Sequence, residues 1–200
     1  MVQILDSRRK PPRGEARRAE ILRRAAAVFR ERGFHGAGMR DIAKSLGMTP
    51  GNLYYYFRSK DDLLYECQRL ALDMLQAGVR RAAAGGGSAA DRLRTAIRDH
   101  VLCLLVETGG SAAHLEFRAL PGPRRAEIAR GRDAYERTLC RLVEDGVRAG
   151  EFRPLDAKLA TRAILGALNA TVTWWRPEGP MSPAEIADAY ATTLVGGLRT

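Results

Sequence analysis

Cysteines are few in this sequence and long apolar runs are absent, and each lack excludes a class of protein. The three cysteines, Cys67, Cys103 and Cys140, lie far apart without a CxxC pair. We therefore expect packed free thiols and neither a disulfide framework nor a zinc site. No run of about 18 apolar residues occurs, which argues against a membrane-spanning helix. The first residues lack the apolar stretch of a secretion signal, so we expect a cytoplasmic protein without a membrane partner.

The sequence also lacks an apparatus for catalysis. Its three histidines, His35, His100 and His114, follow no metal-ligand spacing, and no carboxylate pair or serine elbow accompanies them. We therefore expect a protein that is not an enzyme, with no catalytic residue, metal or cofactor. His100 and His114 are candidates for ligand contact, although hydrogen-bonded histidines of a core or surface are the commoner alternative.

Positive charge, in contrast, is abundant and lies near the N-terminus. The formal net charge is +10, and residues 1–60 hold 14 Lys and Arg against 5 Asp and Glu. Such a concentration suits a protein that neutralises phosphates and releases their counterions, although a merely solvated basic surface is the alternative. Residues 1–14 combine Arg8, Arg9, Lys10 and Arg13 with two prolines and a glycine. We expect a disordered basic arm there, which either follows the minor groove or a phosphate ridge of a nucleic acid or acts as a solubilising tail.

Residues 38–57 have the pattern of two short helices joined by a glycine turn. The first has one buried face, because Met39, Ile42, Ala43 and Leu46 recur at helical spacing. Gly47 supplies the left-handed backbone conformation that ends such a helix. This arrangement predicts the first half of a helix-turn-helix.

The second short helix begins at a strong start signal. Thr49 is a capping hydroxyl, and Pro50 suits the first helical position. Leu53 and Phe57 lie four residues apart and face inward, so the opposite side, formed by Gly51, Asn52, Tyr54 and Tyr55, faces outward. A helix presented in this way fits the major groove of B-DNA. The motif therefore predicts a protein that binds double-stranded DNA.

The remaining chain has a helical pattern without alternating strands, which predicts an all-α protein of about nine helices. We expect a three-helix head with the helix-turn-helix over residues 15–60 and a helical ligand-binding and dimerisation domain over 61–200. The first helix should cover 16–32 and end at Gly33, and Ser59 with Asp62 should cap a fourth that runs to about residue 80. Further helices are expected over residues 90–107, 111–119, 123–149, 156–175 and 183–198.

The last two helices mix small and apolar side chains, which permits close packing between helices. They either pack against a symmetry copy as a four-helix bundle or belong to an ordinary core within one chain, and the pattern alone does not decide. DNA geometry favours a homodimer, because two heads double the length of the site that is read. The candidate dimerisation residues are Ala163, Gly166, Ala167, Ala170, Trp174, Ala187, Tyr190, Ala191 and Leu194.

Residues 19–64 resemble the TetR/AcrR family of one-component bacterial transcriptional regulators. The matching positions include Ile21, Leu22, Ala25, Phe29, Gly33, Phe34, Met39, Arg40, Asp41, Ile42, Ala43, Leu46, Gly47, Met48, Gly51, Asn52, Leu53, Tyr54, Phe57, Lys60, Leu63 and Leu64. The resemblance implies an all-helical homodimer whose head binds a palindromic operator. It also implies a repressor whose larger domain holds a pocket, and which releases the DNA when a small molecule fills that pocket.

Carried over by position, the resemblance also assigns DNA contacts. It places Thr49, Tyr56 and Lys60 at phosphates, and it places Arg40, Pro50, Gly51, Asn52, Tyr54 and Tyr55 at base edges or thymine methyl groups. Arg40 either gives two hydrogen bonds to one guanine or holds a phosphate. For Tyr54 and Tyr56 the alternative is packing of the ring against the head.

One departure from the family pattern lies before the first helix of the motif. The family usually has two hydroxyl residues there, whereas this chain has Ala37 and Gly38. We expect a missing phosphate contact and weaker operator binding, while Asp41 still serves the exposed backbone donors of the first turn. This departure is also the only reason to consider a helical partner-binding protein without operator specificity.

The C-terminal half resembles a branch of the family that regulates fatty-acid and steroid catabolism in response to acyl-CoA thioesters. The segments 150–156 and 174–183 carry this resemblance. It implies cations for the phosphates, for which Arg118, Arg124 and Arg125 are candidates, and an apolar tunnel. The candidate lining residues are Leu102, Cys103, Val106, Leu115, Phe117, Tyr135 and Leu139, each of which otherwise belongs to the core. An activator or dual regulator is the alternative to a repressor.

Overall fold

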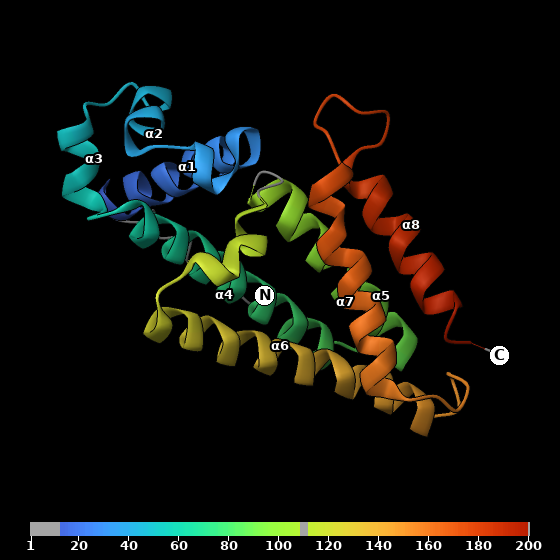
Figure 1. Ribbon diagram of the computed structural model, residues 1–200. Coiled ribbons are helices and arrows are strands. Elements are labelled where there is room, and N and C mark those ends of the chain that lie inside the picture. Colours follow the sequence, from blue (N-terminus) through green and yellow to red (C-terminus); the bar gives the residue numbers. More distant parts are fainter. Residues whose placement is uncertain (1–12, 109–111, 200) are drawn as a thin grey trace, which may run out of the picture.

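The structure is a computed structural model that describes residues 13–108 and 112–199. Across this part of the chain every regular element is a helix and no strand is present, which confirms the all-α prediction. There are eight α-helices in the described residues, and one π-helix and one 3-10 helix lie between α5 and α6 (Figure 1). Their bounds are α1 Arg13–Gly36, α2 Met39–Ser45, α3 Pro50–Tyr56, α4 Lys60–Ala84, α5 Ala89–Leu102, η1 Cys103–Glu107, η2 Ala112–Ala119, α6 Gly122–Arg148, α7 Ala157–Trp174 and α8 Pro183–Gly196.

The first helix is longer than the sequence pattern predicted. It begins at Arg13, so the last two residues of the expected arm are helical, and residues 1–12 of that arm lie outside the described residues. Gly33, where we expected the end, has φ 70° and ψ 160°, values that break the helix there. One further turn follows to Gly36, so the break is a kink within α1 and not its end.

Local capping explains most of the other helix starts. The Asp156 carboxylate accepts a hydrogen bond from the Leu159 N–H at the start of α7. Ser182 and Glu185 form the reciprocal capping box predicted for α8. At α4 the Ser59 hydroxyl accepts from the Asp62 N–H as predicted, but the Asp62 carboxylate accepts from the Arg58 N–H. Each of these signals acts within four residues, which is why the sequence reveals them.

Residues 90–107 do not form the single helix that we expected. The α-helix ends at Leu102 and continues as a π-helix, in which the Thr108 N–H reaches back five residues to the Cys103 carbonyl. The Thr108 hydroxyl also bonds to the Leu104 carbonyl, at 2.7 Å. The segment expected over 111–119 is a 3-10 helix with a kink at Glu116. Short π-helical and 3-10 stretches are common near functional sites, and the spacing of apolar residues does not reveal them.

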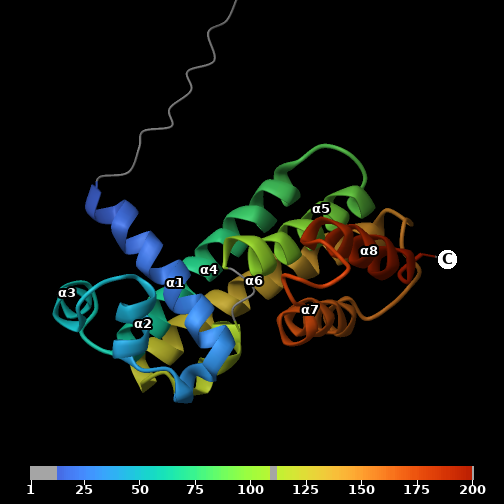
Figure 2. The ribbon, with the colours of Figure 1, turned by 90° about the horizontal axis from the view of Figure 1, so that it is seen from above.

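The molecule has two apolar cores, and α4 contributes to both. The head core unites α1, α2 and α3 with Leu63 and Leu64 of α4, and it also takes in Leu120, just before α6, and Ile128 of α6. The body core gathers α5, α6, α7 and α8 around the far end of α4 at Val79. Figure 1 shows α4 running from beneath the head into the body, with α6 alongside it, and Figure 2 shows the same arrangement from above. The head and the larger domain thus share one long helix.

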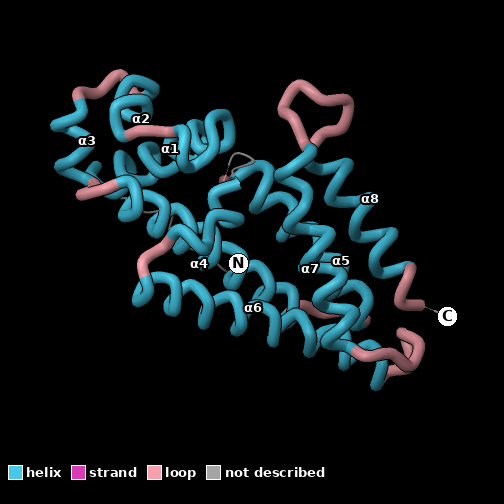
Figure 3. The backbone as a smooth tube through the Cα atoms, viewed as in Figure 1, coloured by secondary structure: helices cyan, strands magenta, loops and turns pink. Residues whose placement is uncertain are grey.

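The C-terminal pair of helices lies at the end of the body that is remote from α3. Figure 3 shows α7 and α8 joined by the long loop of residues 175–182. α8 packs against α5, whereas α7 packs against α6 and η1. No helix in the described ranges combines the length and the apolar character that crossing a membrane requires.

Candidate functional site

The predicted helix-turn-helix is present, and its geometry follows from four residues. Gly47 has φ 62°, the left-handed conformation expected at the turn, and Thr49 Oγ1 accepts a hydrogen bond from the Asn52 N–H at 3.2 Å. Leu53 and Phe57 have no exposed surface, so α3 is fixed to the head by one face only. The opposite face of α3 is left for a partner.

The outward face of α3 carries most of the predicted DNA contacts. Tyr55 is 85% exposed and Tyr54 51% exposed. Tyr56 is half-buried, and its ring meets that of Tyr55 edge-on with centroids 5.2 Å apart. The remaining exposed candidates on α2, α3 and the turn are Arg40, Thr49, Pro50, Gly51 and Asn52. These residues are therefore accessible to DNA, and Tyr56 is partly so.

A groove of about 480 Å³ lies between α3 and the first part of α1. Thr49, Asn52, Tyr55 and Tyr56 line one side of it, and Arg17 of α1 lines the other. The sequence analysis did not single out Arg17, whose guanidinium pairs with Glu20 at 2.7 Å. Only the fold brings this arginine opposite α3.

Lys60 makes a contact that the sequence did not suggest. Its ammonium donates to the Phe34 carbonyl at 2.9 Å and lies 4.5 Å from the centre of the Phe34 ring. The side chain therefore ties the start of α4 to the end of α1 within the head. Contact of Lys60 with a phosphate stays a prediction, and removal of this side chain also removes an internal contact.

The departure at Ala37 and Gly38 is accommodated within the head. The Asp41 carboxylate accepts a hydrogen bond from the Gly38 N–H at 2.9 Å and pairs with Arg32 at 2.6 Å. The bond from Gly38, together with the charge of Arg32, lowers the pKa of Asp41 below its ordinary value. Asp41 thus serves the first turn of α2 as predicted, and the cap does not depend on a hydroxyl.

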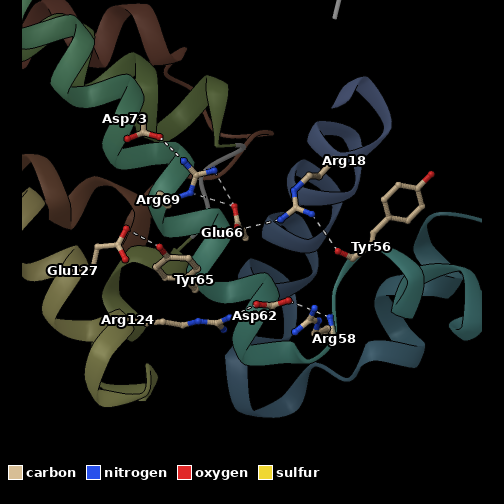
Figure 4. A network of polar contacts seen from close by, with 10 residues as sticks. All are labelled: Arg18, Tyr56, Arg58, Asp62, Tyr65, Glu66, Arg69, Asp73, Arg124 and Glu127. Atoms are coloured by element: carbon tan, nitrogen blue, oxygen red, sulfur yellow. Dashed lines mark hydrogen bonds and ion pairs between the residues drawn. The ribbon is translucent and has the colours of Figure 1, made fainter. Parts of the chain in front are cut away.

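Polar contacts connect the head to α4 and α6 (Figure 4). On one side Arg18 of α1 donates to the Tyr56 carbonyl at 3.2 Å and pairs with Glu66 of α4, also at 3.2 Å. On the other side Arg124 of α6 pairs with Asp62, and the Tyr65 hydroxyl donates to Glu127 at 2.7 Å. Both sides of the first turns of α4 are therefore held by neighbouring helices.

A cavity of about 420 Å³ lies beside α4 in the body. Its walls come from α4, α5, η1, η2, α6 and α7, and its lining residues are Gln68, Ala71, Leu72, Leu75, His100, Leu104, Leu115, Phe117, Arg118, Arg132, Tyr135, Glu136, Arg162, Leu165 and Asn169. Four predicted ligand residues are among them, namely Leu115, Phe117, Arg118 and Tyr135. The volume falls within the range of sites for small molecules.

A second cavity, of about 350 Å³, lies on the other side of α4 and α5. Two more predicted ligand residues, Leu102 and Cys103, line this space, as does Tyr135. The last two predictions are wrong about position. Val106 is 54% exposed and borders neither cavity, and Leu139 is fully buried in the body core.

Of the three arginines proposed for ligand phosphates, only Arg118 borders the large cavity. Arg124 is engaged with Asp62 and lies 4.9 Å over the Tyr65 ring. Arg125 is exposed on α6 and lines neither cavity beside α4. Helical geometry explains the correction, because the first turn of α6 faces the head and only its middle faces the cavity.

The cavity also has polar residues that the sequence analysis missed. Arg132 donates to the Gln68 side chain at 3.3 Å, and its guanidinium lies 4.6 Å over the Phe117 ring. Burial lowers the pKa of Arg132. His100, a predicted ligand contact, lines the cavity and shares a 2.8 Å hydrogen bond with the Tyr135 hydroxyl. The side chain of His114 lies outside the described residues.

All three cysteines are free thiols, as predicted. Cys67 and Cys103 are buried, and Cys140 is half-buried. Burial raises the pKa of both Cys67 and Cys103 to about 12, so these thiols stay protonated and unreactive near neutral pH. In the described residues no group of three or more His, Cys, Asp and Glu side chains is placed to hold a metal ion.

The candidate dimerisation residues divide into two groups. Ala163, Gly166, Ala170 and Trp174 are exposed along one side of α7, and Ala167, Tyr190 and Leu194 are half-buried beside them. The predictions for Ala187 and Ala191 are wrong, because these side chains are buried in the body core on the face of α8 that packs against α5. Small residues on every side of α8 hid this difference from the sequence pattern.

The exposed side of α7 forms a continuous apolar surface. Leu159, which the sequence analysis did not select, is 67% exposed, and it lies four residues before Ala163. Trp174 is 45% exposed and stacks on Tyr190 of α8, with centroids 6.4 Å apart. A β-carbon at Gly166 would meet no atom within 4 Å. An apolar surface of this kind, with space beside its glycine, is typical of an interaction face.

Comparison with known proteins gives matches along nearly the whole chain. Residues 21–67 match the family model described as bacterial regulatory proteins, tetR family, and residues 86–198 match that described as tetracyclin repressor-like, C-terminal domain. The chain is 30% identical over 192 residues to the HTH-type transcriptional repressor KstR2 of Mycobacterium tuberculosis, and the match covers 92% of this chain and 93% of that protein.

Two solved structures show the same fold over the same extent. The TetR family transcriptional regulator PfmR from Thermus thermophilus has a TM-score of 0.80 and 33% identity, and the match covers 90% of this chain and 99% of that one. The structure of AibR in complex with isovaleryl coenzyme A and operator DNA has a TM-score of 0.74 and 27% identity, and that match covers 90% of this chain and 98% of the other.

Proposed function

Because the chain belongs to the TetR family of bacterial regulatory proteins, we propose that it is a homodimeric repressor whose effector fills the cavity beside α4 and releases the operator. The effector is a small apolar molecule or an acyl-CoA thioester. The related AibR structure, which contains isovaleryl coenzyme A and operator DNA, supports this class of ligand.

The exposed face of α3 is the observation that carries the DNA-binding part of the proposal. Tyr54 and Tyr55 project from a helix whose other face, Leu53 and Phe57, is completely buried. Exposed aromatic rings that serve no core contact suit thymine methyl groups and base edges. The basic excess of residues 1–60 adds the attraction to phosphates that nonspecific affinity needs.

The apolar face of α7 supports a dimer. Leu159, Gly166 and Trp174 share the exposed side, and a second copy of the chain would cover this surface and leave both heads free. α7 lies at the end of the body remote from α3 (Figure 1). This separation suits a protein whose two heads reach successive major-groove faces of one palindrome.

The shared helix α4 supports release by an effector. Gln68, Leu72 and Leu75 of α4 line the cavity, and Leu63 and Leu64 of the same helix belong to the core of the head. A ligand that displaces the cavity end of α4 therefore displaces the head. Arg118 at the mouth of the cavity provides positive charge for the phosphates of a thioester.

The test of DNA binding compares the DNA that flanks the gene with scrambled DNA at ~50 and ~200 mM salt. We expect a selective complex that persists at the higher salt. Tyr55→Ala should weaken binding to the operator and leave binding to scrambled DNA unchanged, and Arg130→Ala, at an exposed position on α6, is the control. Lys60→Ala is a less clean variant, because Lys60 also holds Phe34.

Other outcomes would identify the alternatives. Equal binding to both DNAs that disappears at the higher salt would contradict an operator and favour a partner protein. A selective complex combined with lower target expression in a strain that lacks the gene would identify an activator. Release by an acyl-CoA thioester but not by free coenzyme A would support the effector class, and failure of every thioester to release the DNA would contradict it.

A further inference from the structure

Polar side chains are among the most buried lining residues of the large cavity, which a site for a plain hydrocarbon chain does not require. Gln68 is 3% exposed, His100 2% and Tyr135 5%, and all three line the cavity. Asn169 of α7 borders the same space. The lining residues that form the mouth are much more accessible, since Leu115 is 47% exposed and Arg118 and Arg162 are exposed. The enclosed part of the cavity wall therefore carries polar side chains, and the accessible part forms the mouth.

Tyr135 belongs to this enclosed wall and has a defined hydrogen-bonding capacity. Its hydroxyl shares a 2.8 Å hydrogen bond with Nδ1 of His100. Burial raises the pKa of Tyr135, so the phenol keeps its proton at neutral pH. A phenol has one donor and two acceptor positions, and the bond to His100 uses one of them. Whichever group donates in that bond, the hydroxyl retains capacity for one more partner.

The same pair borders empty space on two sides. Leu75, His100 and Tyr135 line both the cavity of about 420 Å³ and that of about 350 Å³. A tyrosine–histidine pair that only filled a core would be enclosed by close-packed side chains. Its position between two cavities instead brings the pair next to space that a bound molecule can fill.

We infer that the effector carries a hydroxyl or keto oxygen at the end remote from the cavity mouth, and that Tyr135 binds this oxygen and sets the preference for it. This inference rests on the proposed function and narrows its ligand class from acyl-CoA thioesters in general to those with an oxygenated acyl group. An acyl chain that ends in a methyl group would place hydrocarbon against the hydroxyl, which then loses a hydrogen bond to water without gaining another. A site that binds a hydroxyl therefore favours ligands that carry it over analogues without it.

The test uses two matched series of medium-chain acyl-CoA thioesters, one ending in a methyl group and one in a hydroxyl group. Binding of each to the full-length protein is measured by calorimetry, and operator release is measured in parallel. For the chain length that fits best, we expect the hydroxylated thioester to bind about threefold to tenfold more tightly. Free coenzyme A is the blank for contacts at the mouth.

Two variants locate the preference. Tyr135→Phe should abolish the preference, so that both series bind about equally, because this change removes the hydroxyl and keeps the ring. Thr138→Val is the matched control on the same helix, since it removes a hydroxyl that bonds to the Ala134 carbonyl and lines neither cavity. It should keep the full preference. The measurement on the unmutated protein stands by itself if Tyr135→Phe does not fold.

The outcomes separate this inference from the proposed function. Equal binding of both series at every chain length would overturn the inference and leave an acyl-CoA-responsive regulator in place. A preference that survives in Tyr135→Phe would overturn the assignment to Tyr135. Binding of neither series would contradict the proposed effector class and the inference together.

Discussion

Arg124, in the first turn of α6, forms an ion pair with Asp62 in the first turn of α4. One turn further along both helices the Tyr65 hydroxyl donates to Glu127 at 2.7 Å. The Asp62 carboxylate also accepts from the Arg58 N–H, two residues beyond the end of α3. These contacts place α6 in direct connection with the reading head (Figure 4).

α6 is also a wall of the cavity. Arg132, Tyr135 and Glu136 of α6 line it, two to three turns after Arg124. An effector that shifts α6 therefore acts on the start of α4 through Arg124 as well as on the middle of α4 directly. Coupling between distant sites needs such a connected element with two arrangements.

The first prediction concerns this connection. Arg124→Met keeps the packing over Tyr65 but removes the charge that pairs with Asp62. We expect a loss of stability below ~1 kcal/mol, because the pair is partly exposed. The coupling free energy, which is given by the ratio of the operator affinities without and with effector, should fall by about 0.5–2 kcal/mol.

Arg69→Met is the control for that variant. Arg69 lies on α4, as Asp62 does, and pairs with Glu66 and Asp73 of that helix. Fluorescence titrations with operator DNA measure the affinity ratio for both variants, and the removal of Arg69 should leave this ratio unchanged. An unchanged ratio in Arg124→Met as well would show that the effector acts without this contact.

How much of the molecule the sequence predicts depends on the distance over which each signal acts. The turn at Gly47 and the caps at Thr49 and Ser182 depend on contacts within a few residues, and all were predicted correctly. Apolar periodicity likewise identified Leu53 and Phe57 as buried. The fold class and the reading head follow from such local information.

The cavity is less predictable because tertiary packing assembles it. Gln68 and Arg132 are 64 residues apart, and only the packing of α4 against α6 brings them together. Arg124 and Arg132 have the same chemistry and occupy the same helix, yet one faces the head and the other the cavity. Composition cannot separate them, since the difference comes from which neighbours the helix meets at each turn.

The second prediction concerns a glycine that the fold requires. Gly146 is buried in α6, and a β-carbon there would lie 2.2 Å from two atoms of the Phe152 ring. Gly146→Ala should therefore destabilise the protein by ~1–3 kcal/mol through overpacking, which exceeds the ~1 kcal/mol gained in helix propensity. Gly196→Ala is the control, because a β-carbon there meets no atom within 4 Å. Urea unfolding measures both, and equal stability of the two variants would contradict the close approach of Phe152.

The third prediction is a pH dependence at the start of α5. Glu151 accepts hydrogen bonds from the Ala89 and Ala90 N–H groups, both at 2.9 Å. The bonds from Ala90 and Ala89 lower the pKa of Glu151 below its ordinary value of 4.5. A lowered pKa in the folded state means stabilisation that is complete above the unfolded-state pKa and is lost as the pH falls through the folded-state pKa.

The comparison of the wild type with Glu151→Gln should follow this sign. The difference in unfolding free energy should be largest near neutral pH and shrink as the pH falls below 4.5. Glu178→Gln, at an exposed position in the loop between α7 and α8, should show little difference at any pH. Urea titrations at several pH values provide the measurement. A difference for Glu151→Gln that grows on acidification would contradict the lowered pKa of Glu151.

The fourth prediction concerns the apolar face of α7. Gly166 is exposed between Ala163 and Ala170, with open space around it in the protomer. Gly166→Arg should therefore be tolerated by the fold, yet it would place a charged side chain in a close contact between two copies of α7. We expect sedimentation to show a dimer for the wild type and a monomer for this variant. Ala126→Arg, at an exposed position on α6, adds the same charge away from that face and should remain a dimer.

DNA binding should then follow the change in assembly. A monomer contacts one half-site, so Gly166→Arg should lose the tight binding to a palindrome and retain only weak binding to either half. Because arginine adds positive charge, a purely electrostatic effect would strengthen binding, and the two explanations predict opposite signs. A Gly166→Arg protein that remains dimeric and binds the palindrome normally would contradict an interface through α7. The exposed residues of α8 would then be the remaining candidates for the interface.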